Sequence, residues 1–186
     1  ETDSGIDNIE ISGGTYEQPR LLGLDKVSIN PKRSENRKES TIAREAYFLS
    51  YAEEIAKVVN IPLMVTGGFR TKEGMEAALR DGACEIVGVG RPLCANPYAI
   101  KELLSGQIDE LPKYEKTLSI GPWWLSPTSP FRLIQAINAF SAQAWFYQQI
   151  KKMGKGLMPD LNLKPWKAFR EDAKADQEAV KEYQNF

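Results

Sequence analysis

Short apolar runs alternate with helical patterns over the first half of the chain. The runs at residues 63–66 and 85–89 are mostly apolar and do not alternate with polar residues. Such runs are typical of strands that are buried on both faces of a parallel sheet. Residues 5–12 alternate isoleucine with polar side chains and also predict a strand. Strands that alternate with helices favour an α/β fold with right-handed crossovers.

Helical periodicity predicts five helices, and several of them have recognisable start signals. Thr71 is positioned to cap the second helix, in which Met75, Ala78 and Leu79 are expected to face inward. Asn96 followed by Pro97 is a start signal for the third. The expected helices lie at residues 42–57, 72–80, 97–106, 129–152 and 166–183.

The fourth of these helices is aromatic and low in charge. A membrane span is not expected there, because glutamine, asparagine and serine residues interrupt it. We expect this helix to pack on the body of the protein; a partner surface or an interfacial membrane contact is the alternative. Its large apolar side chains are those of Phe131, Ile134, Ile137, Phe140, Trp145, Phe146, Tyr147 and Ile150.

Two segments without periodicity divide the pattern. Residues 16–40 are charged and contain two prolines, and a loop of this length inside a domain is usually functional or mobile. Residues 107–128 are irregular and proline-rich. We therefore expect a βα domain at residues 1–106 and an irregular linker with a helical C-terminal extension at residues 107–186.

The amino-acid composition excludes several classes of partner and of catalytic site. The 186 residues are 42% apolar and 26% charged, with 24 basic and 25 acidic side chains. This balance gives no reason to expect nucleic acid or an anionic membrane as the main partner. The chain has no histidine, which excludes a Ser-His-Asp triad, a Cys-His dyad and most zinc sites within it. No metal site is expected.

The two cysteines indicate the cellular compartment. Cys84 and Cys94 are expected to be free thiols in a reducing cytosol, so a cytoplasmic location is expected; a redox pair is the alternative.

The chain starts at Glu1 rather than at Met and shows no signal-peptide pattern. We therefore expect it to be a piece of a longer protein.

Glycines follow two of the predicted strands. Gly67 and Gly68 come after residues 63–66, and Gly90 with Arg91 follows residues 85–89. Glycine lets backbone N–H groups approach a ligand closely, and arginine supplies a fork of donors. Two such turns on successive strands favour a phosphate site; ordinary βα turns with a solvated arginine are the alternative.

The residues around these glycines resemble a known family. Residues 64–71 (MVTGGFRT), residues 82–92 (GACEIVGVGRP) and Asn96-Pro97 are similar to the last two barrel strands of old yellow enzyme-type NADH:flavin oxidoreductases. Residues 5–17 (GIDNIEISGGTYE) resemble the sixth strand in the fungal and bacterial NADH oxidase-like branch. The resemblance implies that residues 1–106 form about strands 6–8 of a TIM (β/α)8 barrel.

The same resemblance implies FMN as cofactor and NAD(P)H as reductant. Gly67, Gly68 and Phe69 would contact the FMN phosphate through their backbone. Gly90 and Arg91 would clamp the phosphate after the eighth strand. Arg70 is a further contributor, and Gly13 and Gly14 would lie near the cofactor. The acceptor would be a small molecule such as an activated alkene.

Departures from the family pattern limit this implication. The family's substrate-orienting His/Asn or His/His pair and its proton-donating tyrosine precede the sixth strand, so no catalytic residue is assigned here. Glu85 replaces a common aspartate. We therefore expect the C-terminal part of an FMN-dependent oxidoreductase that is inactive alone. Its partner would be the N-terminal half of the barrel or a second copy. The alternatives are another phosphate-binding barrel enzyme and a non-catalytic remnant or assembly module.

Overall fold

The computed structural model of the protein describes residues 5–12 and 49–184, which belong to two compact units. Each unit has its own apolar clusters. The division of the chain near residue 106 stays a prediction. Of the described residues, the first unit holds 5–12, 49–93 and 97–112, and the second holds 94–96 and 113–184.

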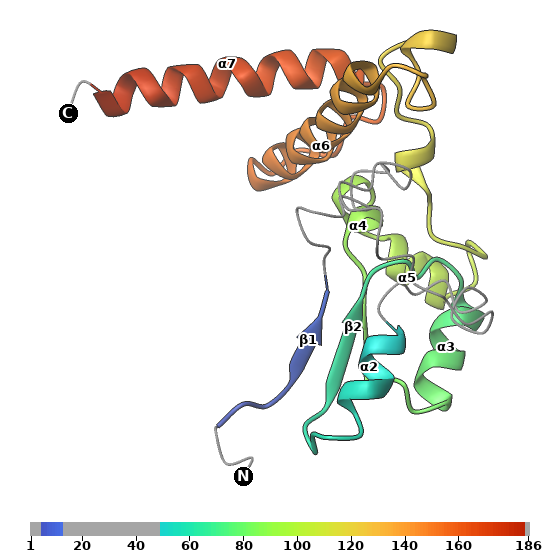
Figure 1. Cartoon of the computed structure of the whole chain (residues 1–186). Helices are drawn as coiled ribbons and strands as arrows, with labels where there is room; N and C mark the ends of the chain where they lie inside the picture. The colour runs from blue at the N-terminus through green and yellow to red at the C-terminus, as the bar shows by residue number, and fades with distance from the viewer. Residues whose placement is uncertain (1–4, 13–48, 185–186) are drawn as a thin grey trace. The chain divides into compact units, whose positions relative to one another are not determined.

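A three-stranded parallel sheet is the centre of the first unit (Figure 1). Its strands are β1 (Ile9–Ile11), β2 (Leu63–Thr66) and β3 (Ile86–Gly88), in that order across the sheet. Both pairings are parallel. This confirms the predicted mixed α/β class and the three predicted strands, although β1 and β3 are shorter than expected.

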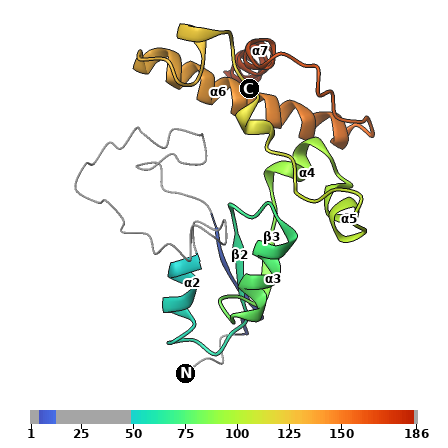
Figure 2. The same cartoon turned by 90° about the vertical axis from the view of Figure 1, so that its right-hand side faces the viewer.

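One face of this sheet is covered by helices. Leu63 and Val65 of β2 are buried together with Leu49 and Ala52 of α2 (Leu49–Ile55) and with Ala78 of α3 (Lys72–Arg80). Figure 2 shows both helices beside the sheet. Alternate residues of each strand point to this face, and their apolar side chains pack against the two helices.

The opposite face of the sheet is only partly covered. Met64 is half-buried, Glu10 is exposed and Ile86 is 41% exposed. Side chains of successive strand residues point to opposite faces, and these three share the face away from α2 and α3. The prediction that the strands are buried on both faces is therefore wrong for the described residues.

Helix α3 has the predicted bounds and the predicted cap. The Thr71 hydroxyl accepts a hydrogen bond from the backbone N–H of Gly74 at 3.2 Å, which satisfies one N–H that has no partner within the helix. Ala78 is buried and Met75 packs against the core, as predicted. Leu79 is 43% exposed, so its predicted inward position is wrong. Gly74 is buried instead, which lets the helix approach its neighbours closely.

Two short helices follow β3 where one was predicted. Helix α4 (Arg91–Ala95) was not predicted. Helix α5 (Ala99–Leu104) starts at Ala99, with Tyr98 at its N-cap position, rather than at Pro97. The start signal at Asn96 and Pro97 therefore lies in the turn that separates the two helices.

The second unit contains two long helices, α6 (Arg132–Gly154) and α7 (Pro165–Gln184). Both were predicted to within a few residues. Before them come two short 3-10 turns, η2 (Tyr114–Lys116) and η3 (Trp123–Leu125). No helix in the described part of the chain is long and apolar enough to cross a membrane.

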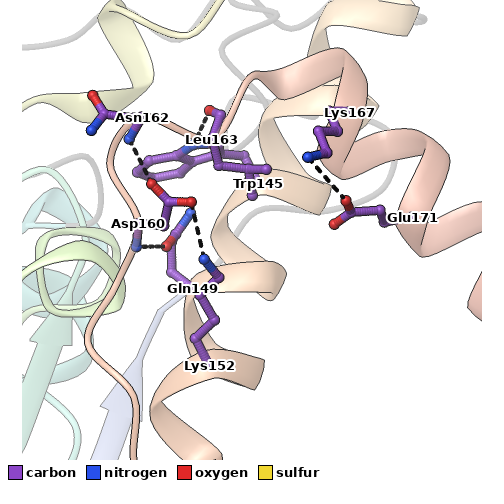
Figure 3. A network of polar contacts seen from close by, with 8 residues as sticks. All are labelled: Trp145, Gln149, Lys152, Asp160, Asn162, Leu163, Lys167 and Glu171. Carbon is purple, nitrogen blue, oxygen red and sulfur yellow. Dashed lines mark hydrogen bonds and ion pairs between the residues drawn. The ribbon is translucent and has the colours of Figure 1, made fainter.

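Trp145 anchors α6 to the rest of the second unit. It is 1% exposed and lies in a cluster with Ala168 of α7. Its indole N–H donates to the carbonyl oxygen of Leu163 at 2.9 Å (Figure 3). This face of α6 is thus packed within the second unit, and packing of the helix on the rest of the protein stays a prediction.

A network of polar contacts holds the loop between α6 and α7 against α6 (Figure 3). The side-chain oxygen of the buried Gln149 accepts a hydrogen bond from the backbone N–H of Asp160 at 2.6 Å. The Asp160 carboxylate accepts one from Lys152 at 3.0 Å. This hydrogen bond is the main reason that the pKa of Asp160 lies below its ordinary value. The network fixes the loop that follows α6 against the helix.

Several predictions fall on residues outside the described ranges. These are the long loop at residues 16–40 and the first turns of the helix expected to start at residue 42. Gly13 and Gly14 also lie outside them.

Candidate functional site

The two glycine turns lie side by side at one edge of the sheet. In the parallel register of β2 and β3, Thr66 is the partner of Gly88. Gly67 and Gly68 directly follow Thr66, and Gly90 comes two residues after Gly88. The carboxyl ends of parallel strands are the usual place for ligands in α/β folds. The structure therefore brings together the two turns that were predicted from separate parts of the sequence.

The first turn has a conformation that favours glycine. Gly67 has φ of 131° and Gly68 has φ of 84°. Residues with a Cβ rarely adopt these values, because the side chain collides with the backbone. Two consecutive positive φ angles also change the direction of the chain sharply between β2 and α3.

The second turn leaves open space beside the backbone. A Cβ placed on Gly90 would meet no heavy atom within 4 Å beyond its chain neighbours. The carbonyl oxygen of Gly90 accepts a hydrogen bond from the N–H of Leu93 at 2.9 Å, which holds the turn in place. The side of Gly90 on which a Cβ would lie is therefore open, which is compatible with the phosphate expected nearby.

Phe69 and Arg70 are directed into the protein. Phe69 is 1% exposed and belongs to the core with Leu63 and Val65. Arg70 is 6% exposed, and its Nη1 donates to the carbonyl oxygen of Phe69 at 2.7 Å. The carbonyl oxygen of Arg70 accepts from the N–H of Leu111 at 2.7 Å. The side chain of Phe69 is therefore not placed to contact a ligand, which leaves its backbone. Arg70 holds the turn through its hydrogen bond to the carbonyl oxygen of Phe69.

Arg91 is the first residue of α4 and is half-buried. It follows Gly90 directly in the chain, at the start of α4. An arginine can bind a phosphate with two parallel N–H···O hydrogen bonds. Arg70, the other arginine expected to contribute, donates from its Nη1 to the carbonyl oxygen of Phe69.

Thr66 and Gly88 belong to this edge but were not predicted as site residues. The Thr66 side chain fills the space that a Cβ on Gly88 would need. Its hydroxyl oxygen is buried and has no hydrogen-bond partner within the described residues. A buried hydroxyl of this kind is a potential donor or acceptor for a bound group. The one sign in the sequence was that Thr66, a polar residue, ends an otherwise apolar strand.

Glu85 joins the starts of β2 and β3 through two hydrogen bonds to Leu63. Its carboxylate oxygen Oε2 accepts a hydrogen bond from the N–H of Leu63 at 2.7 Å. Its own backbone N–H donates to the Leu63 carbonyl oxygen at 2.9 Å. The carboxylate therefore supports the sheet at the edge opposite the glycine turns and has a structural role.

Neither cysteine contributes to a disulfide. Cys84 is buried and Cys94 half-buried, and both are free thiols. Burial, with a smaller contribution from the nearby Glu85, raises the pKa of Cys84 above its ordinary value. Cys84 is therefore a neutral thiol at neutral pH. In the described part of the chain, no group of three or more potential metal ligands is assembled.

The comparisons identify related proteins, although no family model matches the chain. It is 44% identical over 105 residues to an NADH-dependent flavin oxidoreductase of Hypocrea jecorina, covering 55% of this chain and 24% of that protein. It is 31% identical over 157 residues to one of Talaromyces variabilis, covering 82% and 35%. An NADH oxidase of Thermoanaerobacter brockii is 30% identical over 151 residues, covering 81% and 21%.

These relatives confirm the predicted resemblance. The chain is homologous to part of the NADH-dependent flavin oxidoreductases and NADH oxidases, a relationship consistent with an old yellow enzyme-type family. It spans between 21% and 35% of the length of the three relatives described.

Proposed function

We propose that this chain provides the phosphate-binding end of an FMN site in an NAD(P)H-dependent flavin oxidoreductase of the ene-reductase type. The proposal rests on one observation above all. Two glycine turns follow neighbouring strands at the carboxyl ends of a parallel sheet, and Arg91 comes directly after the second turn. The names of the relatives, which include NADH and flavin, support the same cofactor chemistry.

Each residue of the edge has a separate task in this proposal. The N–H groups of Gly67, Gly68 and Gly90 would donate to phosphate oxygens, and Arg91 would balance the phosphate charge. Phe69 is held in the core and sets the position of the turn through its backbone. A flavin bound there would supply hydride-transfer chemistry, with NAD(P)H as the reductant and a small molecule such as an activated alkene as the acceptor.

We also propose that β1, β2 and β3 correspond to strands 6–8 of a (β/α)8 barrel. The half-covered face of the sheet, with Ile86 41% exposed, supports this, because a barrel strand is covered on both faces. The residues that would act on the flavin ring then belong to the other strands of the barrel. We expect no measurable reduction of an activated alkene by this chain with FMN and NADH alone, and turnover would contradict this part.

Binding can be tested without turnover. In a chain labelled with ¹⁵N-glycine, FMN is expected to shift the amide signals of Gly67, Gly68 and Gly90 in a saturable way. Gly106 and Gly156, which follow helices elsewhere in the chain, serve as internal controls. Unchanged signals at the three site glycines, or equal shifts at all glycines, would contradict the proposed site.

A further inference from the structure

The short segment that follows α5 is hydrogen-bonded to the chain that leaves the first glycine turn. The backbone N–H of Leu111 donates to the carbonyl oxygen of Arg70 at 2.7 Å. In the adjacent residues, Thr71 and Glu110 form an isolated antiparallel bridge. Gly68 comes two residues before Arg70, so these contacts hold the end of the first turn, where the chain enters α3.

Leu111 is also held through its side chain. It is 0% exposed and belongs to a cluster of buried apolar residues with Leu103 of α5. Val89 and Leu93 pack against this cluster, and in the chain they stand before and after the second glycine turn at Gly90. The cluster that contains the Leu111 side chain is therefore in contact with both sides of the second turn, while the Leu111 N–H binds the end of the first.

The pairing of the strands does not extend to the two turns. The register of β2 and β3 ends at the pair of Thr66 and Gly88, and the glycines of both turns come later in the chain. A binding site keeps its geometry when packed and hydrogen-bonded residues around it hold its parts in place. The contacts of Leu111 supply such a support beyond the end of the paired strands.

We propose that Leu111 is a positioning residue that holds the first glycine turn in place relative to the second. Its buried side chain fixes the segment in the cluster, and its N–H fixes Arg70 at the end of the first turn. Leu111 is fully buried and acts without touching the ligand, whereas Gly67 and Gly68 would contact the phosphate. The part of this inference that concerns phosphate rests on the proposed function.

Two truncations of leucine in the same cluster test this role. Leu111→Ala removes the side chain that holds residue 111, which lies outside any helix or strand. Leu103→Ala is the matched control, since Leu103 is 2% exposed in the same cluster but belongs to α5 and is held by the helix. Both variants are expected to lower the midpoint of urea unfolding to a similar extent, because they remove the same atoms from one core.

The two variants are expected to differ at the glycine turn. In the flavin-free whole chain labelled with ¹⁵N-glycine, Leu111→Ala is expected to shift the amide signals of Gly67 and Gly68, and Leu103→Ala is expected to leave them unchanged. Leu111→Ala is also expected to bind FMN roughly 10-fold more weakly, because the displaced turn no longer matches the phosphate. Its affinity for riboflavin, which lacks the phosphate, is expected to stay unchanged, whereas a general loss of stability would weaken the binding of both ligands.

The outcomes separate this role from the proposed function. Equal binding of FMN and riboflavin by the parent chain would contradict the phosphate site, and the flavin-free glycine signals would still decide the role of Leu111. If Leu111→Ala does not fold, Leu111→Val removes a single methylene group and is measured in the same way. The proposal is overturned by unchanged Gly67 and Gly68 signals in a folded Leu111 variant or by equal shifts in Leu103→Ala. It is also overturned if a parent chain that prefers FMN keeps its full preference in that variant.

Discussion

The side chain of Thr66 occupies the space that a Cβ on Gly88 would need, across the parallel pairing of β2 and β3. This contact explains why glycine stands at the end of β3, although glycine is otherwise weak inside strands. It also keeps the two strands in close contact just before the two glycine turns. The geometry of the candidate site therefore depends on a small residue facing a threonine.

Gly88→Val is expected to destabilise the protein by about 1–3 kcal/mol, because the added side chain overpacks against Thr66. Urea unfolding followed by circular dichroism measures this free energy. Thr66→Gly on its own removes the opposing side chain, and in combination with Gly88→Val it is expected to recover part of the loss. Equal losses with and without Thr66→Gly would show that the two residues do not interact.

Gly68→Ala is expected to cost about 1–2 kcal/mol in unfolding free energy, because φ at this residue is 84°. Gly90→Ala is the matched comparison, since Gly90 is not among the glycines with positive φ and its Cβ would meet open space. That variant is expected to unfold like the parent but to bind FMN more weakly, because the methyl group fills the approach to the main chain. A stability loss at Gly90 equal to that at Gly68 would contradict the assigned backbone roles.

Trp145→Ala is expected to destabilise the second unit by about 3–5 kcal/mol, through lost packing and a cavity beside α7. Trp123→Ala serves as the control, since Trp123 is 90% exposed, and its effect is expected to stay within about 0.5 kcal/mol. Thermal unfolding followed by circular dichroism of both variants provides the comparison. Similar losses for the two tryptophans would contradict the assigned core.

The Lys152–Asp160 contact predicts a dependence of stability on pH. The pKa of Asp160 is lowered in the folded protein, so the contact stabilises the fold above the unfolded pKa of aspartate. This contribution is lost as the pH falls through the folded pKa. Asp160→Asn is therefore expected to be less stable than the parent at neutral pH and to approach it in acid. A stability difference that does not change with pH would contradict the role of the charge.

The two thiols are expected to differ in reactivity. Burial raises the pKa of Cys84 and keeps it protonated at neutral pH, whereas Cys94 is half-buried. Iodoacetamide should therefore alkylate Cys94 well before Cys84, as peptide mass spectrometry can follow. Faster alkylation of Cys84 would show that the first unit opens readily around it.

Sequence patterns within each segment predicted most of the described helices and strands. The bounds of β2 and α3 follow from a continuous apolar run and from the cap at Thr71. The exposed face of β3 could not be predicted, because a continuous apolar run does not reveal which face another element covers. Helix α4 escaped prediction because five residues are too few to show a helical period.

The positions of the two glycine turns were predictable from the sequence, but the contacts that support them were not. Positive φ at Gly67 and Gly68 follows from a Gly-Gly pair after a strand. The inward position of Arg70 depends on Phe69 and Leu111, and the latter lies about 40 residues further along the chain. The contact between Thr66 and Gly88 depends on strand register, which no local pattern specifies.

The most direct test of the proposed FMN site compares the affinity of the chain for FMN and for riboflavin, which lacks the phosphate. Isothermal titration calorimetry is expected to show FMN binding roughly 10-fold to 100-fold more tightly, as a charged hydrogen bond to phosphate would give. Arg91→Gln is expected to remove most of that difference while leaving riboflavin binding unchanged. Equal affinities for FMN and riboflavin in the parent chain would contradict the phosphate site.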